Sequence, residues 1–402
     1  MFKPQDRIFL PGSCGAPQDI VDAVLSAPDA RITTSFVPGI NPLRSEDIPA
    51  GCVVSGLFMQ PGLADAQRDG RYRHLPFSYA ATIKWLRDQP GFDCCVIQVT
   101  PPDSDGNCSL GPAAEFTPDV LRRAGRIVAV VNPHVPRIAN APVVPVSRFA
   151  HIVHSTAPLP GYDVGEVDAA TRRIASLAAA FIADGDVLQV GLGKVPHALM
   201  QALCDRRNLR LHSGMLSDGV MALAEAGALD PDWAHVTTVV LGSRHLYQWA
   251  AERKDIHVRG VEHSHDPMRL AALERFIAVN SALEVDLFGQ CNLELAAGRA
   301  VSGAGGAPDF ARAARLGRGG MSIVALPATF GGGKGSRIRP LLGDGGLASL
   351  SRVDVDAVVT EQGAADLRGL SVHERAAALI AIAAPDAREG LARAWREMAA
   401  KL

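Results

Sequence analysis

The first segment that could carry chemistry is a glycine-rich loop over residues 191–196, Gly-Leu-Gly-Lys-Val-Pro, which follows a short apolar run. It begins like a dinucleotide-binding fingerprint. However, Pro196 stands where a third glycine would let a helix pack closely against a strand. A dinucleotide cofactor site is therefore not predicted. Two interpretations remain: backbone N–H groups at a helix start that could hold a negative charge, or a tight turn without a ligand.

A second glycine-rich loop spans residues 331–339 and reads Gly-Gly-Gly-Lys-Gly-Ser-Arg-Ile-Arg. Ala328 stands where the phosphate-binding loop of nucleoside triphosphatases starts with glycine, and Gly335 follows Lys334 in place of Ser or Thr. These departures exclude a triphosphate site of that kind. Lys334 and Arg337 would still suit a phosphate or pyrophosphate, although a solvated loop has the same composition.

A third loop, residues 302–306, reads Ser-Gly-Ala-Gly-Gly and precedes a helix start at Pro308. Gly303, Gly305 and Gly306 indicate that the backbone comes close to a packed neighbour or to a ligand. Amides held in this way can donate hydrogen bonds to an oxyanion.

Two groups of histidines could also act in a site. His263 and His265, one residue apart, could hold a metal from a strand, but no third ligand is evident nearby and Pro267 indicates a surface turn. We predict no metal. His212 and Ser213 are neighbours in sequence, which does not give the spatial arrangement that a nucleophile and its base require.

These loops need rigid elements to position them. Seven apolar runs are predicted to be strands: 94–99, 127–131, 187–190, 236–241, 276–279, 323–326 and 356–360. Five amphipathic segments are predicted to be helices: 78–88, 165–184, 196–206, 217–227 and 371–384. Most of the strands are apolar throughout, as strands buried on both faces require. The alternation of strands and helices predicts an α/β fold with parallel sheets covered by helices.

A weak internal repeat relates residues 8–24 to residues 187–203. Each segment has an apolar strand, a glycine, a proline five residues later and one apolar helix face; Pro17 and Pro196 fit the first helical position. We therefore predict two similar α/β domains, 1–164 and 165–402, joined at a Pro-rich linker, with loops aimed at a shared cleft.

Composition limits the function classes. The chain has 402 residues and a formal net charge of −2, so no basic field is available for nucleic acid or a membrane surface. Seven cysteines with no CxxC spacing indicate reduced thiols. The apolar runs are shorter than the about 20 residues needed to span a bilayer, and no signal peptide is apparent. We expect a cytoplasmic protein with no membrane partner.

Taken together, the loops resemble the acetyl-CoA hydrolase/CoA-transferase family, close to the 4-hydroxybutyrate CoA-transferases. The resemblance runs from about Asp6 to the C-terminus and is carried by these segments: 99–111, 188–199, 211–220, 241–249, 280–292, 302–310, 326–340 and 359–369. It implies two open parallel-sheet α/β domains with acyl-CoA bound between them. Coenzyme A would be a substrate and not a permanent cofactor. The resemblance also implies a carboxylic acid acceptor and a homo-oligomer.

The resemblance also assigns roles to residues. It implies oxyanion donors near Val190 and Gly305, and a second carboxylate at Glu361. The residues implied to contact coenzyme A or to line its loops are Gly191, Gly193, Gly303, Gly305, Gly306, Lys334 and Arg337. Residues 263–267 fall where relatives carry a tyrosine–asparagine turn, which favours a role other than metal binding.

One departure concerns the nucleophile. Relatives carry a glutamate two residues after the histidine of the His-Ser pair, and that carboxylate forms the covalent intermediate; Gly214 occupies this position here. Glycine cannot be acylated, so the glutamyl route cannot run through position 214. Three hypotheses remain open: thioester cleavage by water or a bound acceptor, CoA transfer through another carboxylate such as Glu361, and an inactive acyl-CoA-binding homologue. Glu284 and Asp218 are further candidate acids or bases, with structural roles favoured for both.

Overall fold

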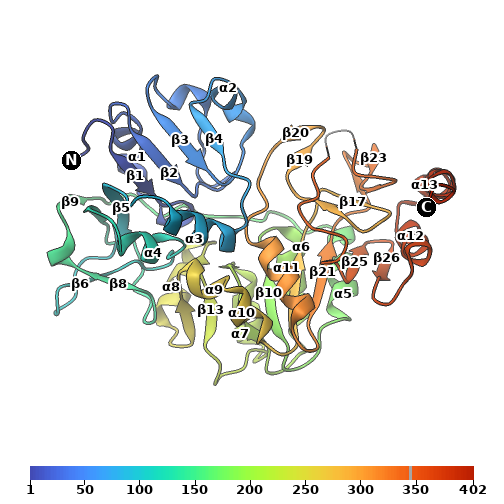
Figure 1. Cartoon of the computed structure of the whole chain (residues 1–402). Coiled ribbons are helices and arrows are strands. Elements are labelled where there is room, and N and C mark those ends of the chain that lie inside the picture. Colours follow the sequence, from blue (N-terminus) through green and yellow to red (C-terminus); the bar gives the residue numbers. More distant parts are fainter. Residues whose placement is uncertain (344–345) are drawn as a thin grey trace.

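Residues 1–343 and 346–402 are described by the structure, a computed structural model (Figure 1). The N-terminal half is built on a seven-stranded sheet in the order β4-β3-β2-β1-β5-β7-β9, with every neighbouring pair parallel. Its strands are β1 (Arg7–Leu10), β2 (Arg31–Thr34), β3 (Val53–Gly56), β4 (Tyr72–His74), β5 (Cys94–Val99), β7 (Arg126–Val131) and β9 (His151–His154). A short antiparallel pair, β6 (Asn107–Ser109) and β8 (Val143–Pro145), lies outside this sheet.

Helices cover the two faces of this sheet unequally. α1 (Gln18–Leu25) and α2 (Ala64–Arg68) pack on one face against residues such as Ile8, Ile32 and Val54. α3 (Tyr79–Asp88) and α4 (Thr117–Leu121) pack on the other face, against Phe9, Ile97 and neighbours on β1, β5 and β7.

The C-terminal half is built on a six-stranded sheet in the order β11-β10-β16-β21-β25-β26, in which only the last pair is antiparallel. Its strands are β10 (Val187–Val190), β11 (Arg210–Leu211), β16 (Phe276–Asn280), β21 (Met321–Ala325), β25 (Ala357–Thr360) and β26 (Gly363–Asp366). α5 (Ala169–Ala179) and α6 (Lys194–Ala202) pack on one face; α11 (Ala307–Leu316) and α12 (Val372–Ala381) pack on the other, where α12 contacts α13 (Pro385–Ala399).

Shorter elements complete the C-terminal half. The helices are α7 (Gly219–Glu225), α8 (Arg244–Glu252), α9 (Val261–Ser264) and α10 (Pro267–Ala271). The strands are β12 (Met215–Leu216), β13 (His235–Thr237), β14 (Val239–Val240), β15 (Ile256–Val258), β17 (Glu284–Asp286), β18 (Cys291–Asn292), β19 (Leu295–Ala296), β20 (Arg299–Ala300), β22 (Thr329–Phe330), β23 (Gly335–Ser336) and β24 (Ile338–Arg339).

The predicted fold class is confirmed: this is an α/β protein with a parallel sheet in each half. Both repeat segments form a strand, a loop and a helix, β1–α1 and β10–α6. The boundary that we place at residue 164 falls between β9 and α5.

Two local predictions were wrong. Pro17 is the N-cap of α1, and Pro196 is the third residue of α6, so neither stands at the first helical position. Pro196 is tolerated because the first four helical N–H groups have no intrahelical partner. The run 236–241 is not one strand. Thr237 Oγ1 donates to Val239 O, a local bond that replaces ladder bonds, and β13 and β14 pair with different strands.

The strand order reverses once in each sheet, between β1 and β5 and between β10 and β16. In open α/β sheets, ligands bind at the carboxyl ends of the strands beside such a reversal. In the C-terminal half this edge carries Gly191 after β10 and Asn280 at the end of β16. The fold therefore directs attention to the loops around Gly191.

The two halves are joined through loop 302–306 and the start of α11. Met59 N donates to Ser302 O at 3.2 Å, and Tyr79 N donates to Gly305 O at 3.2 Å. The Asp309 carboxylate accepts from Ser78 Oγ at 2.6 Å and from the Ala80 amide at 2.9 Å. These bonds fix α11 against the start of α3.

The seven cysteines are free thiols, six of them buried and Cys204 partly exposed. Burial raises the pKa of the Cys14 thiol to about 12, so this group stays protonated. Within the described residues, no helix combines the length and the apolar character needed to cross a bilayer.

Candidate functional site

A cavity of about 220 Å³ lies where the two halves meet. The N-terminal half contributes Val37, Phe58, Tyr79 and Glu115. The C-terminal half contributes the remaining lining: Gln189, Val190, Gly191, Leu192, Gly214, Met215, Thr238, Val239, His265, Asn280, Ala304, Gly305, Gly306, Ala307 and Phe310. Both the β10–β16 reversal and the start of α11 therefore open into this cavity.

Gly214 forms part of the cavity wall between β11 and β12. Its carbonyl accepts hydrogen bonds from the Thr238 amide at 3.3 Å and from the Thr238 hydroxyl. A β-carbon built at Gly214 would lie 3.2 Å from His265 Nε2 and 3.4 Å from Phe310 Cε2. The space beside Gly214 is therefore occupied by the His265 and Phe310 rings.

His265 is buried at the end of α9 and held on several sides. Its ring centroid lies 4.4 Å from that of Phe310 and 5.0 Å from that of Tyr79. A β-carbon at Gly306 would overlap His265 Nε2, so the glycine is required at that position. Burial lowers the pKa of His265 to about 3, and the imidazole is therefore neutral at working pH.

The tautomer of His265 depends on the group to which the Ser264 hydroxyl donates. Ser264 Oγ lies 2.9 Å from His265 Nδ1 and 3.2 Å from Gly260 O. When this hydroxyl donates to Gly260 O, Nδ1 carries the ring proton and donates to Ser264 Oγ. The Nε2 lone pair is then left facing Gly214 and Gly306 as a hydrogen-bond acceptor.

Glu115 is the carboxylate that sequence reasoning missed. It is buried, with 2% of its surface exposed, and its Oε2 accepts from Ser35 Oγ at 2.6 Å. Burial raises the pKa of Glu115 to about 7. A carboxyl group that lines a cavity and has a pKa near 7 is a candidate proton acceptor. The available sequence signal was a single acidic residue inside the otherwise apolar segment 110–116.

Backbone N–H groups are the candidate hydrogen-bond donors of the cavity. Within the described residues, the amides of Gly191, Gly305 and Gly306 have no hydrogen-bond partner. Gly305 and Gly306 precede α11, a helix of 10 residues, whose amino-terminal end carries partial positive charge. The Val190 amide is engaged with Ser213 Oγ at 3.3 Å, so Gly191 is the better-placed donor of that pair.

The structure brings together Val190, Gly191, Gly214, Gly305 and Gly306 of the predicted site. The remaining predicted residues lie outside the cavity lining: Gly193, Gly303, Glu361, Lys334 and Arg337.

Two of the outlying glycines have structural positions. Gly193 is the N-cap of α6, with a φ of 118° that only glycine adopts readily. Gly303 packs so closely on the backbone of Leu57 that a β-carbon would overlap the Leu57 carbonyl oxygen. Gly303 thereby lets loop 302–306 dock on the N-terminal half.

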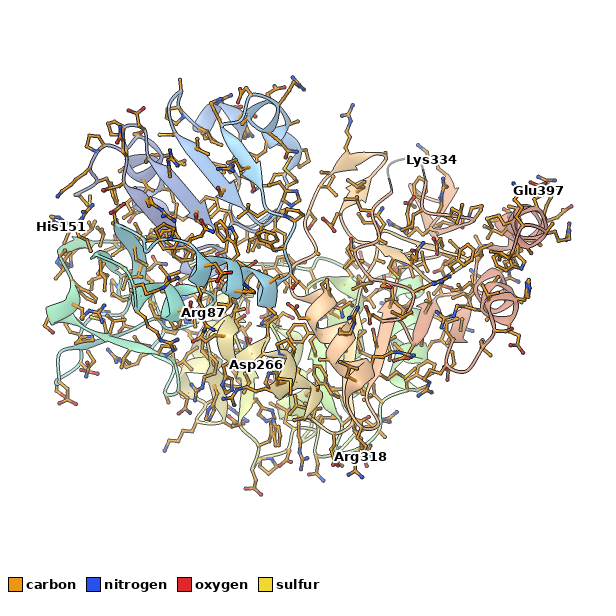
Figure 2. The ribbon with its side chains drawn as sticks, viewed as in Figure 1. Arg87, His151, Asp266, Arg318, Lys334 and Glu397 are labelled. Atoms are coloured by element: carbon orange, nitrogen blue, oxygen red, sulfur yellow. The ribbon has the colours of Figure 1, made fainter. Side chains whose placement is uncertain are left out.

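The charged residues outside the lining are engaged elsewhere or exposed. The Glu361 carboxylate accepts from the Ala328 amide at 2.8 Å. Arg337 donates to Leu283 O at 2.8 Å and to Thr329 O at 3.2 Å. Lys334 is exposed in the hairpin of β22 and β23, at the edge of the C-terminal half (Figure 2).

The other acids named from the sequence also have local partners. Glu284 Oε2 accepts from Asn292 Nδ2 at 3.2 Å, and Arg339 lies 3.7 Å from the same carboxylate. Asp218, at the N-cap of α7, accepts from both the amide and the hydroxyl of Ser243. Neither lines the cavity.

His212 and Ser213 do not form a base–nucleophile pair. His212 Nε2 donates to Ser264 O at 3.0 Å, while Ser213 Oγ donates to Val190 O at 2.9 Å. Each side chain therefore stabilises a backbone segment that lines the cavity.

Comparison with known proteins identifies the class. Residues 1–160 match the family model of the acetyl-CoA hydrolase/transferase N-terminal domain, and residues 242–395 match that of the C-terminal domain. The chain therefore belongs to the acetyl-CoA hydrolase/transferase family of enzymes, which confirms the resemblance inferred from the sequence.

Within this family, the chain is similar to 4-hydroxybutyrate CoA-transferases over nearly its whole length. It is 33% identical to that enzyme of Clostridium kluyveri over 396 residues, 96% of this chain and 92% of the relative. The solved Porphyromonas gingivalis 4-hydroxybutyrate CoA-transferase superposes with a TM-score of 0.79 at 27% identity, covering 98% of this chain and 94% of that one. RipA from Yersinia pestis superposes with a TM-score of 0.89 at 27% identity, covering 99% and 95%.

Proposed function

We propose that this enzyme cleaves an acyl-CoA thioester by direct attack of water or a bound acceptor, without a glutamyl-CoA intermediate. The observation that carries the proposal is Gly214, which offers no carboxylate to the cavity and has the His265 ring packed over it. Membership in the acetyl-CoA hydrolase/transferase family supports the thioester as substrate. Coenzyme A enters as part of the substrate and leaves as a free product.

Glu115 acts as the general base in this proposal. Its carboxylate takes a proton from water as the water oxygen forms a bond to the acyl carbon. The thioester C–S bond then breaks, and the proton passes from Glu115 to the leaving sulfur. The products are a carboxylic acid and free coenzyme A, and the enzyme returns to its starting state.

The backbone stabilises the charge that develops on the acyl oxygen. The Gly191 amide and the Gly305 amide are the proposed donors, because both are free of other partners in the described chain and lie in the cavity lining. The dipole of α11 adds to this stabilisation. The neutral His265 ring, packed beside Gly214, closes this side of the cavity and brings no charge to it.

A second candidate function is CoA transfer between an acyl-CoA and a small carboxylic acid through another enzyme carboxylate. The relatives named as CoA-transferases favour this alternative. Glu361, the residue expected from the sequence, has its carboxylate on the Ala328 amide, whereas Glu115 lines the cavity. The nucleophile of this route would therefore be Glu115. An inactive acyl-CoA-binding homologue remains the third hypothesis.

Separation of the CoA species by chromatography tests these functions. The enzyme is incubated with acetyl-, butyryl- and 4-hydroxybutyryl-CoA, each with and without a second carboxylic acid. We expect free coenzyme A to appear at a rate proportional to enzyme concentration. A new acyl-CoA that forms only with the second acid would favour the transferase, and unchanged substrates in every incubation would favour the inactive homologue.

The homo-oligomer implied by the family resemblance stays a prediction. Light scattering coupled to size-exclusion chromatography measures it directly, and a mass equal to one chain of 42.4 kDa would contradict it.

A further inference from the structure

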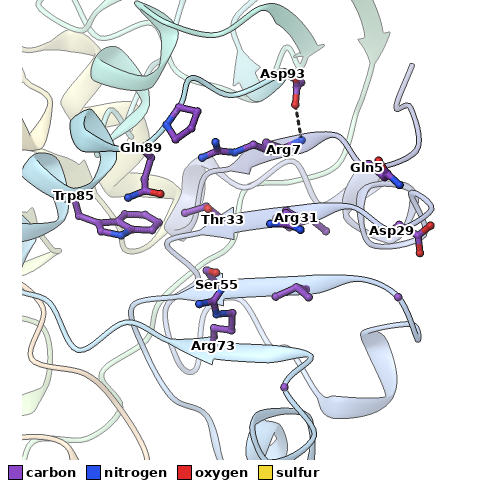
Figure 3. A pocket seen from close by; sticks show the side chains of 15 residues that line it. Gln5, Arg7, Asp29, Arg31, Thr33, Ser55, Arg73, Trp85, Gln89 and Asp93 are labelled. Atoms are coloured by element: carbon purple, nitrogen blue, oxygen red, sulfur yellow. Dashed lines mark hydrogen bonds between the residues drawn. The ribbon is translucent and has the colours of Figure 1, made fainter.

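A large cavity lies on the N-terminal sheet, beside the end of α3. α3 covers β1 and β5, but the same face of β2, β3 and β4 carries the outward-pointing side chains Arg31, Thr33, Ser55 and Arg73. With the neighbouring surface they line a cavity of about 930 Å³ (Figure 3). Parallel sheets ordinarily bury both faces, so this open polar face is unusual. A bound molecule would cover it.

Three arginines line this cavity, and the Arg7 guanidinium lies 5.8 Å from the centroid of the Phe92 ring. Arg7 on β1 and Arg31 on β2 are register partners on adjacent strands, and Arg73 projects from β4 beside its own partner Ser55. No carboxylate of the described residues forms an ion pair with any of the three. Like charges placed opposite one another repel, and a bound anion would relieve that repulsion.

The walls of the cavity differ in character. Trp85 and Gln89 project from the end of α3 on one side, and Asp29 lies at the opposite end (Figure 3). Asp93 also borders the cavity, and its Oδ2 accepts from the Arg7 amide at 2.9 Å. Trp85 and Asp29 therefore lie at opposite ends of the cavity, with Arg31 between them (Figure 3).

We propose that this cavity binds a phosphorylated nucleotide, with the phosphates on Arg7, Arg31 and Arg73 and the base against Trp85. Guanidinium groups bind phosphate oxygens through paired hydrogen bonds, and the Trp85 ring offers an aromatic face for a base. The volume falls in the range of small-molecule sites, which is about 300–1,000 Å³. The same chemistry is found in a free nucleotide and in the nucleotide end of coenzyme A.

Isothermal titration of the full-length protein with ADP tests the proposal. We expect saturable binding, weakened about tenfold or more by Arg31→Gln and by Arg73→Gln, because each change removes charge-assisted hydrogen bonds to phosphate. The matched control is Arg393→Gln on α13, an exposed arginine far from the cavity, which leaves ADP binding unchanged. Equal ADP affinity in all four proteins, or no binding to the wild type, would overturn the proposal.

A second comparison distinguishes binding of the base from binding of the phosphates. Trp85→Leu removes the aromatic wall and keeps the arginines, so we expect weaker ADP binding with tripolyphosphate binding retained. We expect Arg31→Gln to weaken the binding of both ADP and tripolyphosphate. A Trp85→Leu protein that binds ADP as tightly as wild type contradicts the assignment of the base to Trp85.

Competition with coenzyme A identifies the source of the nucleotide. Displacement of ADP by coenzyme A, with the same dependence on Arg31, indicates that the cavity holds the nucleotide end of the substrate. Failure of coenzyme A to displace bound ADP indicates a separate nucleotide site. ADP binding that is lost when protein concentration increases, in step with self-association, would show that a second copy of the chain covers this face and would refute the proposal. None of these readouts requires thioester cleavage.

Discussion

His265 Nε2 lies 3.2 Å from the point where a β-carbon at Gly214 would stand. The absence of a side chain at position 214 and the presence of the imidazole are therefore complementary features of one wall. Phe310 closes the same space from α11, with its Cε2 at 3.4 Å from that point. A carboxylate cannot simply be added here without movement of a ring.

This relationship predicts different outcomes for single and double variants. Gly214→Glu alone forces His265 and Phe310 apart, and we expect a loss of about 1–3 kcal/mol in the free energy of unfolding. Gly214→Glu combined with His265→Asn provides room for the carboxylate. We expect the double variant to regain stability and to acquire CoA-transferase activity, measured as acceptor-dependent formation of a new acyl-CoA.

His265→Asn alone is the control for that pair, since it provides the room without the carboxylate. If Gly214→Glu proves as stable as wild type and the double variant gains nothing over it, the two positions are not coupled as we infer.

The sequence predicted the architecture well where strands are buried on both faces. The predicted runs 94–99 and 187–190 coincide with β5 and β10, because their side chains are apolar in both directions. β2 and β3 were not predicted, since partly exposed side chains on one face of each strand, some of them polar, alternate with core side chains, as Arg31 does with Ile32. That open face is the same one that forms the arginine-lined cavity.

The site was predicted only in part, for a physical reason. Loops 191–196 and 302–306 could be identified because their glycines mark close approaches of the backbone. Glu115 could not, since its place in the cavity depends on a backbone turn with a φ of 42° and on long-range packing against Ser35. His265 was considered only as a metal ligand, because its position over Gly214 follows from the docking of α9.

Glu115→Gln should lower the rate of thioester cleavage by about a hundredfold or more, because it removes the proposed general base. The pKa of Glu115 is raised to about 7, so wild-type kcat/KM should increase with pH up to about 7 and then level off. The His265 pKa of about 3 places its titration below this range. A pH–rate profile of both proteins measures the effect.

Glu262→Gln provides the matched control, because Glu262 is another largely buried carboxyl with a raised pKa that does not line the cavity. We expect its profile to keep the rise toward pH 7. A Glu115→Gln enzyme with the same rise would remove Glu115 from the mechanism.

The same pKa makes stability depend on pH. The pKa of Glu115 is raised from an ordinary value of 4.5 to about 7, so the folded protein holds a proton that the unfolded chain has lost within this window. The contribution of Glu115 to stability is therefore present below pH 4.5 and declines as the pH rises toward 7, by on the order of 3 kcal/mol. Glu115→Gln should lack this decline, measured by urea unfolding at several pH values. Parallel declines in the two proteins would contradict the assignment.

Gly306→Ala should disrupt the cavity, because its β-carbon would overlap His265 Nε2. We expect a loss of about 1–3 kcal/mol in the free energy of unfolding and strongly reduced thioester cleavage. Gly390→Ala is the control: it lies inside α13 with no atom within 4 Å of the added carbon, and alanine there should stabilise the protein by about 0.5–1 kcal/mol. Thermal unfolding of the two variants gives the comparison, and a Gly306→Ala protein of wild-type stability would show that His265 has room to move.

The most direct test of the account is to trap the enzyme during turnover. Wild-type protein is mixed with an acyl-CoA substrate, treated with borohydride, and measured by intact-mass spectrometry while free thiol is followed in parallel. Thiol release with an unmodified protein mass is the predicted result, since no enzyme thioester exists to be reduced. A reduced carboxyl at Glu115 or Glu361, located by peptide mapping, would show that a covalent carboxylate route operates after all.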